Sequence, residues 1–372
     1  MKTNGFRLRV FDAHLTYPAG QEVHTAASGR IASLAEVFLK IEARETGLVG
    51  FGEVRANIEF ISHTPEQAVI PGVVSLGKRL ADAGDLNQLL EQFEERRDEV
   101  PNICQAVFEN ALCDLRAKMD GVSAAEHLGG VWQSSVNCNQ CVFWGTDQDM
   151  HRNLESYVAE GFHDIKLRVG IGTIDDDERR LRWMRDTYRG QISLAVDANG
   201  VWQREQALRN IEILEHVGID YCEQPVPEGD WESLEWLAER TDVDLVLDEG
   251  LQHDSDVERL CANKGRISAH LKIAKAGGVY RVVNIGRQLD QHGVSYVMGQ
   301  MNEGALATAV AVQAGMVLIP RVGELYGALN IDNDPGTGVT YGAGTVSTRQ
   351  QAGVGVSIDE DQLSLRWESD ES

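Results

Sequence analysis

The sequence predicts an α/β protein, a (β/α)8-type barrel with an N-terminal α+β capping domain. Three observations predict this fold. The length of 372 residues suits a barrel of ordinary size plus a smaller domain. After residue 136, short apolar runs alternate with helical patterns, as expected of βα units in a parallel sheet. Charged residues that end these runs recur about every 25 residues, the length that one strand, one helix and two loops require.

The predicted barrel strands are eight apolar runs of six to eight residues. They cover residues 136–143, 164–169, 192–199, 219–225, 244–250, 268–275, 294–299 and 316–322. An open doubly wound sheet is the alternative, but such a sheet usually has a glycine-rich phosphate loop after its first strand. The segment FWGTDQD at residues 143–149 is not such a loop. The barrel is therefore favoured.

The chain divides into three parts. Residues 1–128 form the capping domain, which we expect to govern substrate specificity: residues 6–60 alternate like strands, and Thr64 to Met119 has helical spacing with a stop at Gly121. Residues 129–325 form the catalytic barrel. Residues 326–372 are rich in glycine and irregular, and we expect them to return to the capping domain.

Composition excludes several partners. The net charge of −24 repels a phosphate backbone, so nucleic acid is not an expected partner. No uncharged apolar run of about 18 residues occurs, so no membrane-spanning helix is expected. The N-terminus has the pattern of a first strand rather than of a signal peptide. These features predict a cytoplasmic protein.

Three consecutive predicted strands end in carboxylates, at Asp197, Glu223 and Asp248. In such barrels the C-terminal ends of the strands form the active site. Neighbouring parallel strands lie about 4.8 Å apart, so the three carboxylates can converge. Unpaired they would repel one another, and an all-oxygen ligand set suits Mg²⁺. One such residue is more often a strand-end cap or an ion-pair partner, but three at matched positions predict a magnesium site.

The strands that flank this triad end in cations. Lys166 and Arg168 lie two residues apart and so face the same side of their strand. Lys272 ends the sixth strand, with Lys275 just beyond. Such cations would face opposite sides of a substrate, and a desolvated lysine can remove the proton next to a carboxylate to leave an enediolate. Lys272 and Lys166 are therefore candidate bases. The alternative is that these cations only neutralise the triad.

Two further carboxylates follow the last two predicted strands. Glu303 lies in MGQMNEG and Glu324 in VGELYG. Each is a candidate catalytic residue, as an acid or a hydrogen-bond partner, and a surface charge is the alternative for each.

Together these motifs resemble the enolase superfamily, specifically the muconate-lactonizing branch of the mandelate racemase/muconate lactonizing enzyme family. The mandelate racemase branch carries a histidine on its seventh strand, which GVSYVMGQ lacks. The end of the capping domain, ALCDLRAKMDG with LGG, and the run MNEGALATAVAVQAG with ELYG fit the same family. The motifs that carry the resemblance are K-x-R at residues 166–168, VDAN-x-x-W at 196–202, EQP at 223–225, DE at 248–249 and LKIAKAGG at 271–278.

The resemblance implies Mg²⁺ as the cofactor and a lysine base that acts on a small carboxylate. Asn199 in VDAN and Glu249 in DE are expected to lie beside the metal ligands. A homo-oligomer is also expected. Specificity is expected from capping-domain loops at residues 17–30 and 55–63, where His24, Arg55 and Asn57 are candidate substrate contacts, and solvated loop residues are the alternative.

One position departs from the family pattern. Its second-strand motif is usually K-x-K, whose second lysine is the acid/base on one face, and here that position is Arg168. Arginine stays protonated and accepts protons poorly. Either Lys166 takes this role, or Arg168 binds a substrate carboxylate or stabilises the enolate. Chemistry with one base on the Lys272 side is retained in every case.

The expected activity is Mg²⁺-dependent removal of the proton next to a substrate carboxylate, in a racemase, epimerase or cycloisomerase. A dehydratase of a hydroxylated acid that uses the same site is the alternative. A third hypothesis is a barrel that binds metal without catalysis. Arg168 favours it, whereas Lys272 beside a complete triad argues against it.

Overall fold

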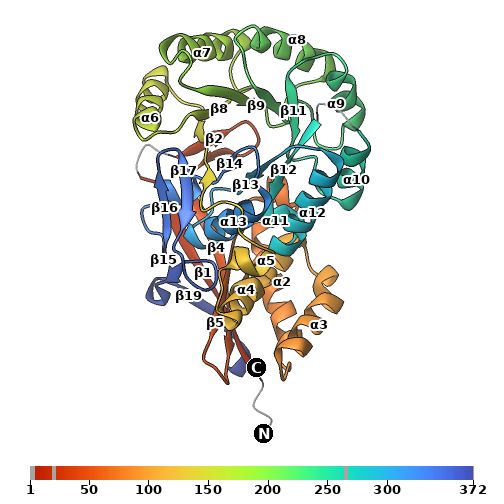
Figure 1. Cartoon of the computed structure of the whole chain (residues 1–372), viewed down its shortest axis with the longest axis vertical. Helices are drawn as coiled ribbons and strands as arrows, with labels where there is room; N and C mark the ends of the chain where they lie inside the picture. The colour runs from red at the N-terminus through yellow and green to blue at the C-terminus, as the bar shows by residue number, and fades with distance from the viewer. Residues whose placement is uncertain (1–4, 19–21, 264–266, 372) are drawn as a thin grey trace.

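The structure is a computed structural model that describes residues 5–18, 22–263 and 267–371. Two parts are visible in Figure 1. The middle of the chain forms the upper part, and the N-terminal region lies below it together with strands from the C-terminal end. No helix among the described residues is long and apolar enough to cross a membrane.

The lower part contains a four-stranded antiparallel sheet in the order β19–β1–β4–β5. A turn at residues 44–48 joins β4 to β5, and Gly47 has a φ of 69°, which favours glycine. A small hairpin, β2–β3, lies apart from this sheet. The strands are β1 (Phe6–Thr16), β2 (Val23–Thr25), β3 (Gly29–Ile31), β4 (Ser33–Ala43), β5 (Val49–Arg55) and β19 (Ser364–Glu368).

Helices cover one face of this sheet. Helix α4 packs closely on β5, and glycine at position 52 permits this approach. A Cβ at Gly52 would lie 2.0 Å from the carbonyl oxygen of Val107. The helix ends where predicted, with Gly121 at a φ of 70°. The helices are α1 (Glu59–Ser62), α2 (Glu66–Leu80), α3 (Leu86–Arg96), α4 (Asn102–Asp120) and α5 (Ala124–Leu128).

The upper part is a parallel eight-stranded barrel, which confirms the predicted fold class. The strands follow one another in sequence order from β7 to β14. A parallel bridge between Cys138 and Gly323 closes the sheet, with the Asn139 amide 2.9 Å from the Gly323 carbonyl oxygen. The strands are β7 (Gln140–Val142), β8 (Asp164–Arg168), β9 (Ser193–Asp197), β10 (Tyr221–Glu223), β11 (Asp244–Leu247), β12 (Ile267–Lys272), β13 (Tyr296–Gly299) and β14 (Gly323–Glu324).

Helices surround this barrel. The helices lie in the seven connections between consecutive strands from β7 to β14, and α11 and α12 share one of these connections. No α-helix follows β14 among the described residues. The helices are α6 (Asp147–Ala159), α7 (Ile174–Thr187), α8 (Arg204–Glu215), α9 (Trp231–Ala238), α10 (Asp254–Ala262), α11 (Ile273–Ala276), α12 (Val279–His292) and α13 (Ala305–Leu318).

Two strand predictions are wrong in detail. The run at residues 316–322 was expected to be the eighth strand, but its first three residues end α13, and β14 begins only at Gly323. A short apolar run cannot be told from the end of a buried helix by periodicity. The predicted strand 136–143 is two strands: β6 (Val136–Asn137) pairs outside the barrel, and only β7 enters it.

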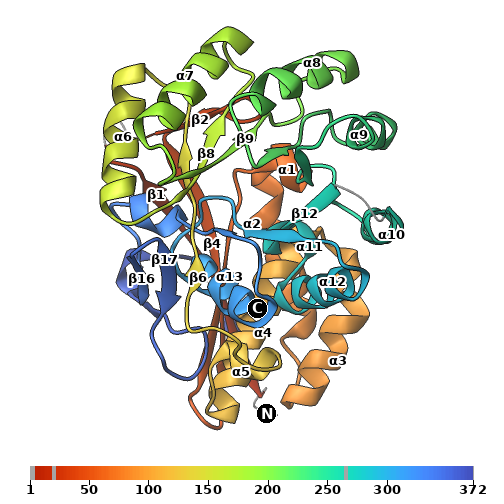
Figure 2. The same ribbon diagram turned by 45° about the horizontal axis from the view of Figure 1, so that its top comes forward.

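The segment after β14 contacts both parts. Strand β17 pairs with β16 and with β6 beside the barrel (Figure 2), and β19 pairs with β1 in the antiparallel sheet. The domain boundaries near residues 128 and 325 remain predictions. The elements are β15 (Gly336–Thr337), β16 (Val339–Gly342), β17 (Thr345–Thr348) and β18 (Ser357–Ile358), with 3-10 turns at Gly327–Asn330, Glu360–Gln362 and Ser369–Glu371.

Candidate active site

The three carboxylates meet at the C-terminal ends of the barrel strands. Asp197 and Glu223 end β9 and β10 and are direct register partners. Asp248 follows β11 and lies two residues beyond Val246, the partner of Glu223, so its side chain points to the same face. All three are buried, at 0%, 0% and 2% exposure. The stagger between β10 and β11 thus places the third carboxylate further along the barrel axis than the other two.

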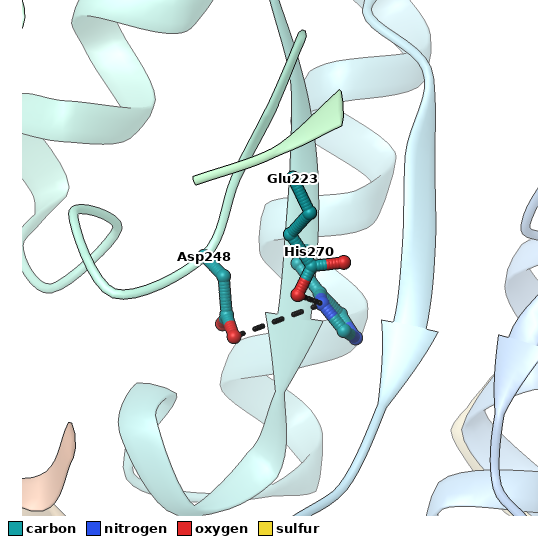
Figure 3. Close-up of side chains that lie close together, drawn as sticks. All are labelled: Glu223, Asp248 and His270. Atoms are coloured by element: carbon teal, nitrogen blue, oxygen red, sulfur yellow. Dashed lines mark hydrogen bonds and ion pairs between the residues drawn. The ribbon is translucent and has the colours of Figure 1, made fainter. Parts of the chain in front are cut away.

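A histidine that the sequence analysis did not identify joins this group. His270 Nδ1 lies 3.0 Å from Glu223 Oε1 and 3.8 Å from Asp248 Oδ2 (Figure 3). One ligand atom from each of these three residues lies within 4.8 Å of the others. Since a carboxylate can only accept, Nδ1 carries the proton of this hydrogen bond. A sequence signal was present: His270 lies two residues before Lys272 on β12, so both side chains face the same way.

Gly299 on the neighbouring strand makes room for this histidine. A Cβ at Gly299 would lie 2.0 Å from His270 Nε2. This nitrogen is buried and has no hydrogen-bond partner among the described residues. Burial lowers the pKa of His270 and outweighs the opposite effect of Glu223, so the neutral ring is favoured.

Two lysines hold Asp248. Lys272 Nζ donates to Asp248 Oδ2, and Lys275 Nζ lies 2.6 Å from Asp248 Oδ1. Burial works to raise the pKa of Asp248, but Lys272 and Lys275 outweigh it and hold the pKa well below its usual value. Burial likewise works to lower the pKa of Lys272, but Asp248 and Glu223 raise it overall. Lys272 is therefore a protonated partner of Asp248 in this arrangement.

Lys166 and Arg168 contact the carboxylates on the other side of the site. Lys166 Nζ lies 2.8 Å from Glu223 Oε2 and 3.6 Å from Asp197 Oδ2, and it also contacts Glu324. Arg168 bridges two carboxylates, since Nη1 donates to Asp197 and Nη2 lies 3.2 Å from Glu324 Oε1. Asp197 thus pairs with two cations. It is not part of the group of potential metal-ligand atoms that Glu223, Asp248 and His270 form.

Of the other candidate residues, Asn199 and Glu249 lie beside the carboxylates. The Asn199 backbone amide lies 2.8 Å from Asp197 Oδ1, and Asn199 Nδ2 lies 3.0 Å from Glu249 Oε1. Burial, with the charge of Asp248, raises the pKa of Glu249 to about 7.

Glu324 joins the ionic network and Glu303 does not. Glu324 accepts from Lys166 and Arg168. Glu303 instead accepts from backbone amides, with Oε2 3.1 Å from the Met301 nitrogen and Oε1 3.5 Å from the Arg55 nitrogen. The structure thus separates two carboxylates that the sequence analysis treated alike.

A pocket opens between the capping domain and this end of the barrel; we call it the cap–barrel pocket. It uses parts of both predicted specificity loops, of which residues 19–21 lie outside the described residues. His24 and Asn57 do not line it. The lining residues from the capping domain are Val23, Thr25, Ser28, Ile31, Arg55, Phe60 and Ile61, and those from the barrel are Arg168, Asn199, Asp248, Glu249, Lys272, Gln300, Met301, Asn302 and Glu324.

The donor set fits a hard divalent cation. Buried carboxylate oxygens from neighbouring strands converge here, as oxygen-binding cations require. The ionic network contains five carboxyl groups and four cationic side chains, and burial raises the pKa of one of the five, Glu249, to about 7. The carboxyl groups are Asp197, Glu223, Asp248, Glu249 and Glu324, and the cations are Lys166, Arg168, Lys272 and Lys275.

The fold and these charged groups define a class of protein: a capped parallel barrel with buried carboxylates and lysines at its C-terminal strand ends. The model of the family Enolase C-terminal domain-like matches residues 149–362. The chain therefore belongs to this family, and the predicted membership of the enolase superfamily is confirmed. The prediction of an enzyme is confirmed with it.

Known relatives resemble the chain over most of its length. It is 23% identical over 345 residues to N-succinyl-L-Arg/Lys racemase of Bacillus cereus, covering 90% of this chain and 91% of the racemase. The crystal structure of a Bacillus cereus N-succinyl Arg/Lys racemase matches with a TM-score of 0.88 at 20% identity, covering 99% of this chain and 100% of that one. A chloromuconate cycloisomerase of Delftia acidovorans is 28% identical over 226 residues, covering 60% of this chain and 61% of the cycloisomerase.

A third relative was solved with ligands. The dipeptide epimerase of Cytophaga hutchinsonii, in complex with Mg and the dipeptide D-Ala-L-Val, matches with a TM-score of 0.87 at 23% identity. The match covers 97% of this chain and 98% of the epimerase. At this identity the structural match establishes the shared fold.

Proposed function

We propose that the protein is a Mg²⁺-dependent isomerase that removes the proton next to the carboxylate of a small substrate. The observation that carries this proposal is the position of Lys272, which lies beside Asp248 and lines the cap–barrel pocket. Relatives named as racemases, epimerases and cycloisomerases support the isomerase class.

We assign Asp197, Glu223 and Asp248 as the Mg²⁺ ligands. Bound Mg²⁺ would supply a Lewis acid that stabilises negative charge on the carboxylate oxygens of the substrate. In this assignment His270 orients Glu223 through Nδ1. Asn199 orients Asp197 through its backbone amide and in turn contacts Glu249 through its side chain. Mg²⁺ in the relative's crystal structure supports the choice of metal.

Lys272 is assigned as the base. Its Nζ must lose a proton before it can accept one from the α-carbon. Asp248 opposes this, because its charge helps to raise the pKa of Lys272. A cation bound by Asp248 would compensate the charge of this carboxylate, and the burial of Lys272 would then favour its neutral amine. Proton removal from the α-carbon then leaves an enediolate.

Arg168 and Lys166 are assigned to the opposite face. Arg168 remains a guanidinium and acts by charge and hydrogen bonding, and Lys166 holds Glu223 and Glu324 in place. A single base on the Lys272 side suits cycloisomerisation or one-sided proton transfer. It also suits elimination of water, so a dehydratase is the second candidate function.

Hydrogen exchange tests the proposed function. The protein with Mg²⁺ should incorporate deuterium from D₂O at the α-carbon of a matching carboxylate, which NMR detects without net turnover. The panel comprises N-acyl amino acids, dipeptides, muconate-like diacids and acid sugars. Product analysis of the acid that exchanges separates isomerisation from dehydration. Absence of exchange across the panel, with folded protein and bound Mg²⁺, would contradict the proposal.

Arg168→Lys tests the one-base assignment. Lysine cannot bridge Asp197 and Glu324 as the guanidinium does. The stabilisation of the transition state should therefore fall by about 1.5–3 kcal/mol, and activity should fall with it. Stereospecific deuterium incorporation in wild type and variant is the measurement. Arg179→Lys, on the exposed side of α7, is the matched control and should have no effect. Wild-type exchange of both enantiomers at comparable rates would contradict the assignment and give the second role to Lys166.

A further inference from the structure

Glu109 is a buried carboxylate of the capping domain that the proposed mechanism does not use. It lies on α4 and is 2% exposed. Its Oε1 lies 2.7 Å from the backbone nitrogen of Tyr280 and 3.2 Å from that of Arg281. Both amides belong to the first turn of α12, a helix of the barrel. A side chain of the capping domain therefore accepts hydrogen bonds from the barrel backbone.

Gly278 explains why α12 takes this acceptor from another domain. It is the N-cap residue of α12, a position where a side chain usually accepts from the free amides of the first turn. Glycine has no such side chain, and Glu109 fills the role instead. A Cβ at Gly278 would lie 2.2 Å from the carboxyl carbon of Glu109, and the φ of 143° at this position also favours glycine.

Two more side chains of the capping domain bind the segment just before α12. Asn102 Nδ2, at the start of α4, lies 2.7 Å from the Lys275 carbonyl oxygen. Arg97 Nη2 lies 3.4 Å from the Gly277 carbonyl oxygen and 3.0 Å from Glu109 Oε2. We call Arg97, Asn102 and Glu109 the cap clamp. The cap clamp thus binds the backbone carbonyls that end α11 and the backbone amides that begin α12.

The segment held by the cap clamp carries the two lysines that contact Asp248. Lys272 ends β12, where it pairs with Gly299 of β13, and α11 begins at the next residue. Lys272 Nζ donates to Asp248, and Lys275 Nζ lies 2.6 Å from Asp248 Oδ1. Beyond Lys272 the chain leaves the sheet, so the position of α11 depends on contacts outside the sheet. A shift of α11 would move Lys275 directly and would change the backbone geometry at Lys272.

We propose that Glu109 and Asn102 are positioning residues that align the catalytic base. Neither residue lines the cap–barrel pocket, and both act through the backbone around α11. This inference rests on the proposed function, in which Lys272 removes the α-proton. A displacement of about 1 Å in a reacting group can cost about 100-fold in rate. Docking of the capping domain then sets the position of the base as well as closing the pocket.

Alanine variants of the two residues test this role in the Mg²⁺-loaded protein. For the acid of the panel above that wild type exchanges fastest, Asn102→Ala and Glu109→Ala should lower kcat for α-proton exchange by about 10–100-fold, with little change in KM. Glu109→Gln keeps an oxygen for the amides of α12 and should retain more of kcat than Glu109→Ala. In the protein without substrate, mass spectrometry should show faster hydrogen–deuterium exchange of the amides at residues 273–281.

Asp114→Ala is the matched control. Asp114 lies on the same helix and is 1% exposed. It accepts from the Phe51 and Val354 amides and pairs with Lys118, away from α11 and α12. Its loss leaves buried amides without an acceptor, as the loss of Glu109 does, so thermal unfolding should shift in both variants. Only the Glu109 variant should lose kcat.

The outcomes separate positioning from a purely structural role. Unchanged kcat in both Asn102→Ala and Glu109→Ala overturns the inference alone, and so does an equal fall of kcat in Asp114→Ala. Asn102→Ala removes a single hydrogen bond and decides the question if Glu109→Ala does not fold. Wild type that exchanges no acid of the panel overturns the proposed function, and the inference with it.

Discussion

Lys272→Ala should reduce turnover by about 100- to 10,000-fold, the usual contribution of a positioned base. The Nζ of Lys272 lies at Asp248 and lines the cap–barrel pocket, and no other described lysine except Lys275 contacts that carboxylate. The loss should appear in kcat with little change in KM, because proton transfer occurs only in the transition state. Steady-state kinetics and α-proton exchange measure it.

Lys272→Arg separates the two roles that a cation can have here. If Lys272 only neutralises Asp248, arginine preserves the charge and restores the rate. If Lys272 is the base, the arginine variant stays as inactive as the alanine variant. Lys78→Ala, exposed on α2, is the surface control. Near-wild-type turnover of Lys272→Ala, combined with loss in Lys166→Ala, would reverse the assignment of faces.

Glu223→Gln should weaken Mg²⁺ binding by at least about 10–100-fold, since loss of groups that merely support a ligand already costs that much. Exhaustive chelation should abolish activity, and added Mg²⁺ should restore it. Calorimetric Mg²⁺ titration gives the affinity. The barrel should remain folded, because Lys166 keeps its contacts with Glu324 and Asp197 when Glu223 becomes neutral. Undiminished turnover after chelation would contradict the metal assignment.

Two further variants decide which residues complete the ligand set. The sequence points to Asp197, whereas the ligand atoms that lie within 4.8 Å of one another belong to Glu223, Asp248 and His270. If Asp197 is a ligand, Asp197→Asn should lose Mg²⁺ affinity as strongly as Glu223→Gln, and His270→Asn should lose less. Retained affinity in Asp197→Asn, with loss in His270→Asn, would establish Glu223, Asp248 and His270 as the ligands.

The sequence by itself determined the barrel and the charged residues at its strand ends. Asp197, Glu223 and Lys272 each terminate a buried strand, and a polar residue in such a place is visible without a structure. The period of about 25 residues assigned these strands to one parallel sheet. Their catalytic and ligand roles remain predictions.

Local sequence did not predict where an element ends, or where a side chain points, when packing against other elements decides it. The last predicted strand failed because residues 316–318 are as apolar as a strand, yet they complete the buried helix α13. Glu303 follows β13, whereas Glu324 ends β14 and contacts Lys166 and Arg168. The direction in which a loop side chain points is set by packing rather than by its position in the sequence.

Only the tertiary structure decided which distant segments meet at the site. His270 enters the carboxylate group because Gly299, on the next strand, has no side chain in its way. Arg55 faces the pocket because its Nη1 donates to the Met301 carbonyl oxygen, 246 residues away in the chain. Such contacts depend on strand register and on the packing of the capping domain over the barrel. Sequence periodicity reports the face on which a residue lies within its own element, and it carries no information about the residue that an opposing element places there.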